Sequence, residues 1–170
     1  MTEAQVIGIA TAAMMENGAE AVGYSLWCCS GLYTIQAVSR PTNRKIEKGE
    51  PVYVQIGAKV SGYSISIARP LVIGTCTGEM RRFYQVGCDA ENLTIKLMHS
   101  GIAVCDVAKK VHAFITEQGY GDTILYGPAH GCGQMECEWP FVETSSKLIL
   151  EENMTFHADI FLANKKMGYR

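Results

Sequence analysis

The most constraining stretch of this chain lies between Tyr126 and Pro140 and reads Tyr-Gly-Pro-Ala-His-Gly-Cys-Gly-Gln-Met-Glu-Cys-Glu-Trp-Pro. Its three glycines permit positive φ and a close approach of other chain segments, and its two prolines interrupt regular hydrogen bonding. The pattern predicts a shaped loop rather than the interior of a helix or strand. His130 stands among these flexible neighbours, as a metal ligand or proton-transfer group often does. A hydrogen-bonded loop histidine without a further role is an equally good interpretation.

Length and charge limit the class of protein. The chain has 170 residues, 48% of them hydrophobic, which suits a single domain over residues 1–170 with a real core. The net charge of −2 provides neither a basic surface for nucleic acid nor a polybasic membrane signal. No apolar run reaches the roughly 18 residues of a membrane span, and no secretory signal is visible at the N-terminus. A cytoplasmic protein with no nucleic-acid or membrane partner is therefore expected.

The seven cysteines are an odd number, and two of them, Cys28 and Cys29, are adjacent. No pair of cysteines has the Cys-x-x-Cys spacing of a zinc knuckle. In a chain without a secretory signal, reduced thiols are expected in place of a disulfide framework, most of them as small buried side chains.

Three helices are predicted from capping residues and apolar periodicity. The first covers residues 2–17, where Thr2 and Gln5 have the spacing of a capping box. The second follows Thr77 and runs over residues 78–99 with an apolar stripe, and the third lies between Gly101 and Gly119.

Strands are predicted at residues 21–29, at 51–58, and from Gly62 towards residue 73, the last two as an antiparallel hairpin. Two more strand candidates, at residues 147–150 and 154–162, follow the His130 segment. Helix, strands, two helices, loop and strands, in this order, indicate an α+β domain with a mostly antiparallel sheet covered by helices.

The segment His130-Gly131-Cys132-Gly133 through Glu138-Trp139-Pro140 resembles the loop His-Gly-Ile-Gly-Leu-x-x-His-Glu-x-Pro of the pita-bread superfamily. That superfamily includes methionine aminopeptidase, aminopeptidase P, prolidase and creatinase. The first histidine, both glycines, the glutamate and the proline match, and Cys137 replaces the second histidine. Further stretches resemble the family in the same order: residues 46–51, Gly62-Tyr63 with Arg69, Ile73-Gly74, residues 100–102 and residues 150–156. The resemblance implies a pita-bread fold with a curved sheet, apparently shortened at both ends.

The peptidases of this family hold two metal ions with Asp, Asp, His, Glu and Glu. By resemblance, the two aspartates fall at Gln55 and Ser66, the histidine at His130 and the first glutamate at Asp159, whereas the second glutamate lies beyond residue 170. Divalent ions need anionic oxygen ligands in a dry pocket, so no cofactor is expected at these positions. Gln55, Ser66 and Cys137 are then expected to contact the substrate.

A single divalent ion (zinc, iron or manganese) on His130, His157 and Asp159, with Cys137 nearby, is an alternative. His157 and Asp159 are two residues apart, so their side chains point to the same face of an extended strand. A strand with a polar face accounts for the same spacing. Glu136 also shares a face with Glu138, where a solvated edge is expected.

Creatinase is a member of the superfamily that dispenses with metals, and Pro41-Thr42-Asn43-Arg44 followed by Gly49 resembles its branch. The acid/base histidine of creatinase would fall at Val38, so creatinase activity itself is not supported. The remaining acid/base candidates are His130 with Glu138 or Asp159. Arg69 either holds a substrate carboxylate or pairs with Asp159.

Two functions follow from the resemblance. The first is an Xaa-Pro peptidase-like or creatinase-like hydrolase of a peptide or small molecule, either metal-independent or weakly active. The second is a non-catalytic pseudoenzyme that serves as a binding or scaffold module. The family often dimerises, so a homo-oligomer is expected.

Overall fold

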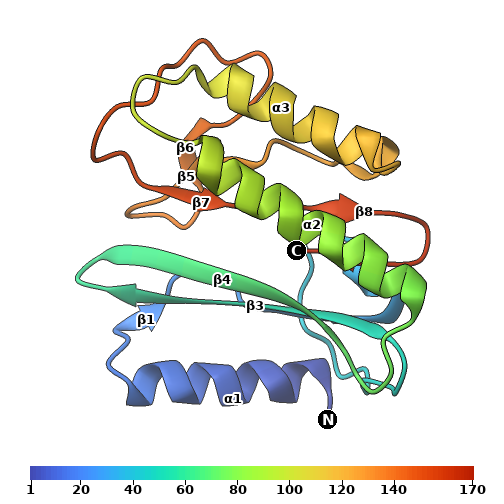
Figure 1. Cartoon of the computed structure of the whole chain (residues 1–170). Coiled ribbons are helices and arrows are strands. Elements are labelled where there is room, and N and C mark those ends of the chain that lie inside the picture. Colours follow the sequence, from blue (N-terminus) through green and yellow to red (C-terminus); the bar gives the residue numbers. More distant parts are fainter.

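The computed structural model describes all residues from Met1 to Arg170 (Figure 1). The α-helices are α1 (Glu3–Glu16), α2 (Gly78–Leu97) and α3 (Val104–Glu117), and two 3-10 helices are η1 (Gly31–Ile35) and η2 (Gly121–Thr123). The strands are β1 (Ala21–Val22), β2 (Trp27–Ser30), β3 (Pro51–Val60), β4 (Tyr63–Val72), β5 (Ala129–Gly131), β6 (Glu138–Phe141), β7 (Phe156–Ala158), β8 (Leu162–Ala163) and β9 (Gly168–Tyr169). In Figure 1, α1 lies on one side of the β3–β4 ribbon and α2 and α3 lie on the other. No helix combines the length and the apolar content needed to cross a membrane.

The predicted antiparallel hairpin is confirmed by β3 and β4. The two strands pair along their whole length, from Pro51 opposite Val72 to Val60 opposite Tyr63. A two-residue turn at Ser61 and Gly62 joins them, with φ of 51° and 79°. Positive φ at both central turn residues matches the twist of the flanking strands.

The single strand predicted at residues 21–29 is wrong, because the chain bulges in its middle. Val22 lies opposite Ala58, and Trp27 lies opposite Gln55. Five steps along this segment therefore face three steps along β3. The extra residues leave the ladder and divide the segment into β1 and β2, both on the edge of β3 that is remote from β4.

The three predicted helices are confirmed. Thr2 and Gln5 form the capping box of α1, and the Thr77 hydroxyl caps α2. Gly101 and Gly119, which flank α3, have φ of 89° and 85°. These left-handed conformations let the chain turn sharply at either end of α3.

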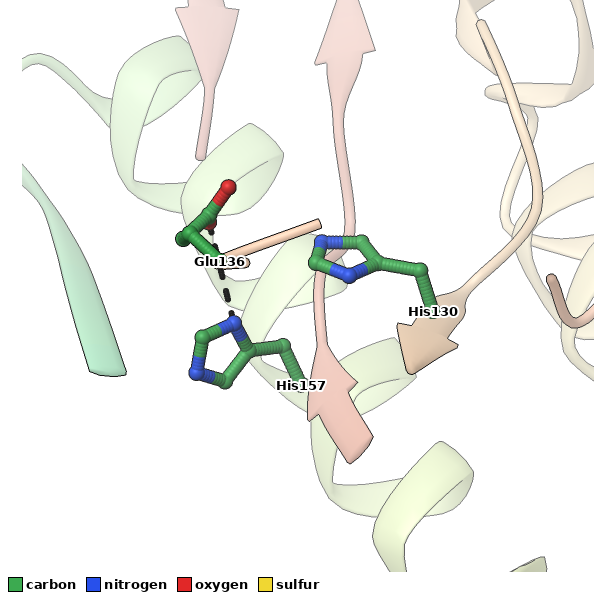
Figure 2. A group of neighbouring side chains, drawn as sticks. All are labelled: His130, Glu136 and His157. Carbon is green, nitrogen blue, oxygen red and sulfur yellow. Dashed lines mark ion pairs between the residues drawn. The ribbon is translucent and has the colours of Figure 1, made fainter. Parts of the chain in front are cut away.

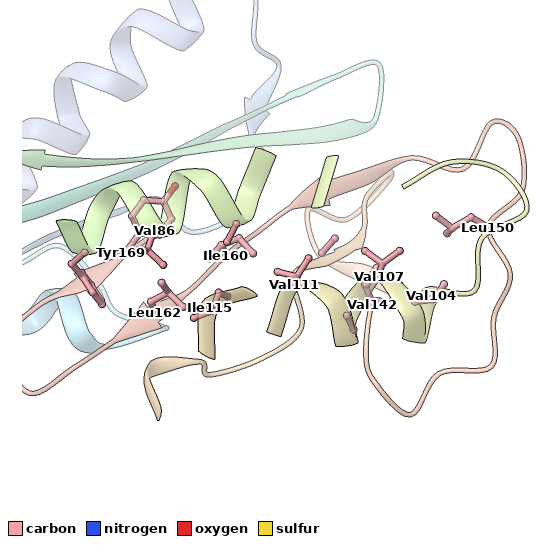
Figure 3. Close-up of a cluster of buried hydrophobic side chains, with 14 of the residues drawn as sticks. Val86, Val104, Val107, Val111, Ile115, Val142, Leu150, Ile160, Leu162 and Tyr169 are labelled. Atoms are coloured by element: carbon pink, nitrogen blue, oxygen red, sulfur yellow. The ribbon is translucent and has the colours of Figure 1, made fainter. Parts of the chain in front are cut away.

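The main core lies where the stripes of α2 and α3 meet the strands after the His130 segment (Figure 3). Phe83 and Ala90 of α2 and Val107 and Val111 of α3 are fully buried there. A smaller cluster joins Trp27, Cys29, Tyr53 and Phe161 beneath the site described below. All seven cysteines are free, but only Cys28 and Cys29 are buried, so the prediction that most of the seven are small buried side chains is wrong.

A buried carboxylate fixes α1 to the main sheet. The Glu3 side chain is 1% exposed and accepts hydrogen bonds from the backbone amides and hydroxyls of Ser30 and Thr42, at 2.6–2.9 Å. Four donors to one carboxylate offset the cost of its burial.

The predicted loop at residues 126–140 is wrong in part, because both of its ends are strands. His130 lies in the middle of β5, which pairs with β6 on one side and β7 on the other. None of the three glycines of this segment has positive φ. Glycine is required by crowding instead: a Cβ on Gly131 would lie 2.8 Å from the Trp139 carbonyl oxygen.

The strands predicted after the His130 segment are also wrong in part. Residues 147–150 contain only one isolated bridge, between Ala103 and Ile149. The segment predicted at 154–162 is divided into β7 and the start of β8.

Candidate functional site

Two adjoining cavities lie between the main sheet and the three-stranded sheet of β5, β6 and β7. The inner cavity, of about 180 Å³, is lined mostly by polar side chains from β3, β4 and β7. The outer cavity, of about 400 Å³, has apolar walls that include Trp27 and Phe141. Glu136, Asp159 and Arg170 line both cavities and so form their common boundary.

Two histidines face each other across neighbouring strands. His130 of β5 lies directly opposite His157 of β7, and their ring centroids are 5.5 Å apart with the planes nearly perpendicular. Figure 2 shows both rings turned towards the Glu136 side chain, which enters from the loop between β5 and β6. Suitable nitrogen and oxygen atoms of these three residues lie within 4.8 Å of one another.

Glu136 is held as a carboxylate by donors from three strands. The Ser66 hydroxyl donates to its Oε1 at 2.8 Å, and the Gln55 Nε2 donates to the same oxygen at 3.3 Å. His157 Nδ1 lies 3.6 Å from this oxygen (dashed in Figure 2). Burial opposes the charge, but the nearby His157 ring, the hydrogen bond from Ser66 and the charge of His130 outweigh it, so the pKa of Glu136 lies below its usual value.

The backbone determines the tautomer of His157. The Ser66 backbone N–H points at Nε2 of His157 over 3.3 Å, so this nitrogen accepts. In the neutral ring the proton is therefore on Nδ1, which faces Glu136.

Asp159 forms a second charged group with Arg170. The Oδ2 atom of Asp159 accepts from Arg170 Nη2 at 3.1 Å and from the Tyr126 hydroxyl at 2.9 Å. The Arg170 guanidinium also lies over the Trp27 ring, 4.6 Å from its centroid, and donates to the Ala37 carbonyl. Burial alone would raise the pKa of Asp159, but the neighbouring His130 ring, the charge of Arg170 and the hydrogen bond from Tyr126 lower it.

His130 links the two groups, because one ring nitrogen bonds the backbone and the other lies near Asp159. Its Nδ1 donates to the Gly131 carbonyl at 2.9 Å, and its Nε2 lies 3.6 Å from Asp159 Oδ2. Burial works against the charge, yet the Asp159 carboxylate and the Gly131 carbonyl outweigh it and raise the pKa of His130 above its ordinary value.

The structure brings together five of the residues predicted from the sequence. Gln55, Ser66, His130, His157 and Asp159 all line one or both cavities. Cys137 is exposed and lines only the outer cavity.

The other two predicted residues lie apart from this cluster. Glu138 lines neither cavity, and its carboxylate accepts from the Met135 amide within its own loop. The predicted pairing of Arg69 with Asp159 is wrong: Arg69 is exposed, donates to the neighbouring Ala68 carbonyl and only lines the inner cavity.

Sequence reasoning missed two central residues. Glu136 was expected on a solvated edge beside Glu138, but it is 9% exposed because its loop folds the side chain back onto Ser66. Arg170, not Arg69, is the partner of Asp159. The spacing in the sequence favours neither arginine, because the choice depends on how β9, which Arg170 follows, and β4, which contains Arg69, are placed around Asp159.

The donors at this site do not fit the two-metal centre that the family resemblance implies. At two of the carboxylate positions, the Gln55 amide and the Ser66 hydroxyl donate hydrogen bonds to Glu136. The remaining carboxylate, Asp159, is already neutralised by the permanent charge of Arg170. A pair of divalent ions would add positive charge where the protein already has a cation and side-chain donors.

Comparison with known sequences gives one consistent result. The sequence profile of the family described as Metallopeptidase family M24 matches residues 1–169. The Xaa-Pro dipeptidase of Pyrococcus furiosus is 25% identical over 155 residues, which are 91% of this chain and 44% of that protein. An uncharacterized peptidase, YqhT, of Bacillus subtilis is 28% identical over 141 residues, or 83% of this chain and 40% of its own length.

Comparison with solved structures shows which fold the chain shares. An X-Pro aminopeptidase from Thermotoga maritima superposes with a TM-score of 0.95 at 24% identity, over 99% of this chain and 48% of that one. The prolidase from Pyrococcus furiosus gives the same TM-score and identity over 99% and 50%. The chain therefore spans about half the length of the relatives it matches.

Proposed function

The chain belongs to metallopeptidase family M24 and has the pita-bread fold, and from this premise we propose that it hydrolyses an amide C–N bond of a peptide or small peptide-like molecule. We further propose that it does so without the two-metal centre. Because the chain spans about half the length of its relatives, their activities enter here only as support.

The observation that carries this proposal is a buried carboxylate, Glu136, and a buried histidine, His130, at one cavity. Glu136, whose pKa is lowered, is a carboxylate at neutral pH, and His130, whose pKa is raised above its ordinary value, is protonated more readily than a free imidazole. Both line the outer cavity. Amide hydrolysis needs a base for the attacking water and an acid for the leaving nitrogen, and this pair supplies both.

The reaction then needs no further co-reactant. Glu136 takes a proton from water, and the water oxygen attacks the carbonyl carbon of the substrate. The tetrahedral intermediate collapses as the C–N bond breaks, and His130 gives its Nε2 proton to the departing nitrogen. Asp159, fixed by Arg170 and Tyr126, orients His130 and stabilises its charged form before transfer.

A non-catalytic binding module is the second candidate. It is favoured by the amide of Gln55 and the hydroxyl of Ser66 at positions where the family resemblance places carboxylates. Such a module needs the cavities but not an acid and a base, so turnover separates the two functions.

The test is hydrolysis of a panel of unblocked dipeptides, with chelator present, by the wild type, Glu136→Gln and Glu138→Gln. Replacing Glu136 removes the base while a neutral oxygen still faces Ser66, so kcat should fall by about 10²–10⁴. Glu138→Gln is the matched control, because this carboxylate only bonds the Met135 amide. A kcat within about threefold of wild type is expected for it, since no reacting group changes.

Loss of activity in Glu138→Gln alone would contradict the role of Glu136 and return the base to the residue expected from the sequence. No turnover of any dipeptide by a folded wild-type protein would contradict the hydrolase and favour the binding module.

A further inference from the structure

Helix α1 is apolar on every side, although only one of its sides faces the main sheet. Its only polar side chains belong to four residues: Glu3, Gln5, Thr11 and Glu16. A helix without a polar side is typical of a buried position. Much of α1 is nevertheless open to solvent, and its exposed apolar residues are Ile9, Ala12, Ala13 and Met15. Ile9 is 61% exposed.

The few polar residues do not give α1 a hydrated outer side. Glu3 is buried against the main sheet. The Gln5 amide oxygen accepts from the Thr2 backbone N–H at 2.8 Å as part of the capping box, and the Thr11 hydroxyl donates to the Ile7 carbonyl of the same helix at 2.8 Å. The outer side of α1 therefore has the composition of a buried surface.

The face of β4 on the same side of the sheet is apolar as well. Glu3 of α1 bonds Ser30, which lies opposite Val52, and Val52 lies opposite Leu71. Directly opposite residues of paired strands share a face, so Leu71 and every second residue of β4 face the side on which α1 lies. The large apolar side chains of this face are all exposed: Tyr63, Ile65, Ile67 and Leu71. Arg69 is the one charged residue among them.

The molecule exposes more surface than a monomer of its size needs to. Its accessible surface is 9306 Å², and its mass is 18.6 kDa. A folded monomer of this mass exposes about 8,200 Å², so the excess is about 1,000 Å². Each partner of a stable complex contributes about 800 Å² to the interface. Figure 1 shows where such a surface is available, because α1 has no second helix beside it on its side of the β3–β4 ribbon.

We propose that this surface is the interface of a symmetric dimer in which α1 of each protomer packs on β4 of the other. A two-fold axis that runs between the two α1 helices places them side by side, with one main sheet on either side of the pair. Each α1 then lies between β2 and β3 of its own protomer and β4 of its partner. The contact is isologous, so the two apolar surfaces of both protomers are buried together.

A second copy of the chain fits this surface better than a foreign partner does. The exposed side of α1 requires an apolar sheet, and the exposed face of β4 requires an apolar helix. One protomer carries both, whereas a foreign partner would have to supply both in the same arrangement. The inference does not depend on the proposed hydrolysis, because Gln55 and Ser66 lie on the opposite face of β3 and β4 from this surface.

The experiment measures the mass of the protein in solution by analytical ultracentrifugation. We expect a wild-type dimer at about 100 μM, since interfaces of standard size have Kd values of μM or less. Ile9→Glu in α1 and Ile67→Glu in β4 each occur twice in the symmetric contact, so each should raise the Kd by at least about 100-fold. Ile95→Glu is the matched control, because Ile95 is 59% exposed on α2, on the other side of the sheet. It should change the Kd by less than about threefold.

A mixture of the two interface variants tests the exchange of α1 between protomers. In the mixed dimer, one contact carries both substitutions, and the other joins an unchanged α1 to an unchanged β4. The mixture should therefore dimerise at least about tenfold more tightly than either variant alone. A dimer held by contacts between the two α1 helices alone would gain nothing from mixing.

Three results overturn the inference. A wild-type monomer at about 100 μM would assign the surface to another occupant, such as a further segment of a longer chain or a different protein. A dimer that Ile9→Glu and Ile67→Glu leave intact, or a mixture no tighter than its components, would place the interface elsewhere. Should either variant fail to fold, hydrogen exchange in the wild type decides: protection of α1 and β4 should rise with protein concentration, and constant protection overturns the inference.

Discussion

At the scale of residues, the chemistry of the site depends on which carboxylate faces which histidine. Glu136 faces His157, and Asp159 faces His130. Because Arg170 adds a permanent positive charge to the second group, the cluster accommodates two carboxylates and a charged histidine without a large net charge. Electrostatic balance of this kind allows opposite protonation states to coexist in a space of a few ångströms.

The raised pKa of His130 predicts that stability falls as pH rises. The folded state binds this proton more tightly than the unfolded chain, so its contribution is complete below the unfolded pKa of about 6.5 and is lost as pH rises through the folded pKa. Between pH 6 and 8, before cysteines titrate in the unfolded chain, the free energy of unfolding should fall by up to about 1.4 kcal/mol per pH unit. Urea unfolding of wild type and His130→Asn across this range measures it.

His130→Asn should show a flat profile over the same window, because asparagine does not titrate. An equal slope in both proteins would mean that another group is responsible. Asp159 has the opposite sign: its lowered pKa gives stability above the unfolded value near 3.9, which is lost as pH falls through the folded value.

Which residues of the site can be predicted from the sequence depends on how far apart they lie along the chain. His157 and Asp159 are predictable as neighbours because alternation along an extended chain is local. Glu136 is not, because the direction of its side chain is set by a loop that closes onto Ser66, about 70 positions earlier in the chain. Arg170 is likewise identified only when β9 brings the chain end beside Trp27.

At the scale of elements, the helices were predictable and several strands were not. Caps and apolar stripes are encoded within a few residues, so α1, α2 and α3 agree with their predicted ranges apart from one to three residues at their ends. The division of residues 21–29 into β1 and β2 depends on the register against β3, which a single segment does not encode.

Two glycines in helices provide a matched prediction about packing. A Cβ on Gly87 of α2 would lie 2.5 Å from the buried Tyr169 ring, whereas a Cβ on Gly8 of α1 would meet nothing within 4 Å. Gly87→Ala should therefore destabilise the protein by about 1–3 kcal/mol through overpacking. Gly8→Ala should stabilise it by about 0.5–1 kcal/mol, since alanine is the better helix former. Chemical denaturation of both variants tests the pair.

Gly87→Ala should also disturb the candidate site, because displacement of Tyr169 moves Arg170, its neighbour in the chain. A weaker Arg170–Asp159 pair would lower catalytic efficiency together with stability. A stabilised Gly87→Ala variant would contradict the close contact between α2 and β9.

At the scale of the whole molecule, the chain has the pita-bread fold of a peptidase family, and we propose that it lacks the family's usual metal donors. The pita-bread architecture needs the hairpin, the two covering helices and the crowded glycines, and these features are all present. The metal donors are separate from these packing requirements, since Gln55 and Ser66 occupy their strand positions without disturbing the pairing of β3 with β4. Fold and chemistry can therefore diverge independently. The expected homo-oligomer remains a prediction.

The donor set predicts that divalent ions do not stabilise this protein. An ion present at 100 times its Kd adds about 2.7 kcal/mol to the free energy of unfolding, or roughly 5–10 °C in melting temperature for a chain of this size. We expect Mn²⁺, Co²⁺ and Zn²⁺ each to shift the melting temperature by less than about 1 °C, because Gln55, Ser66 and Arg170 bring donors and positive charge to the site.

A specific pattern of variants would contradict this expectation. A clear shift that disappears in His157→Gln and persists in the exposed-site control Arg69→Gln would assign one ion to His130, Glu136 and His157, whose ligand atoms lie within 4.8 Å of one another. Such a result would make Glu136 a metal ligand, and metal-bound water would then be the nucleophile in place of water activated by Glu136.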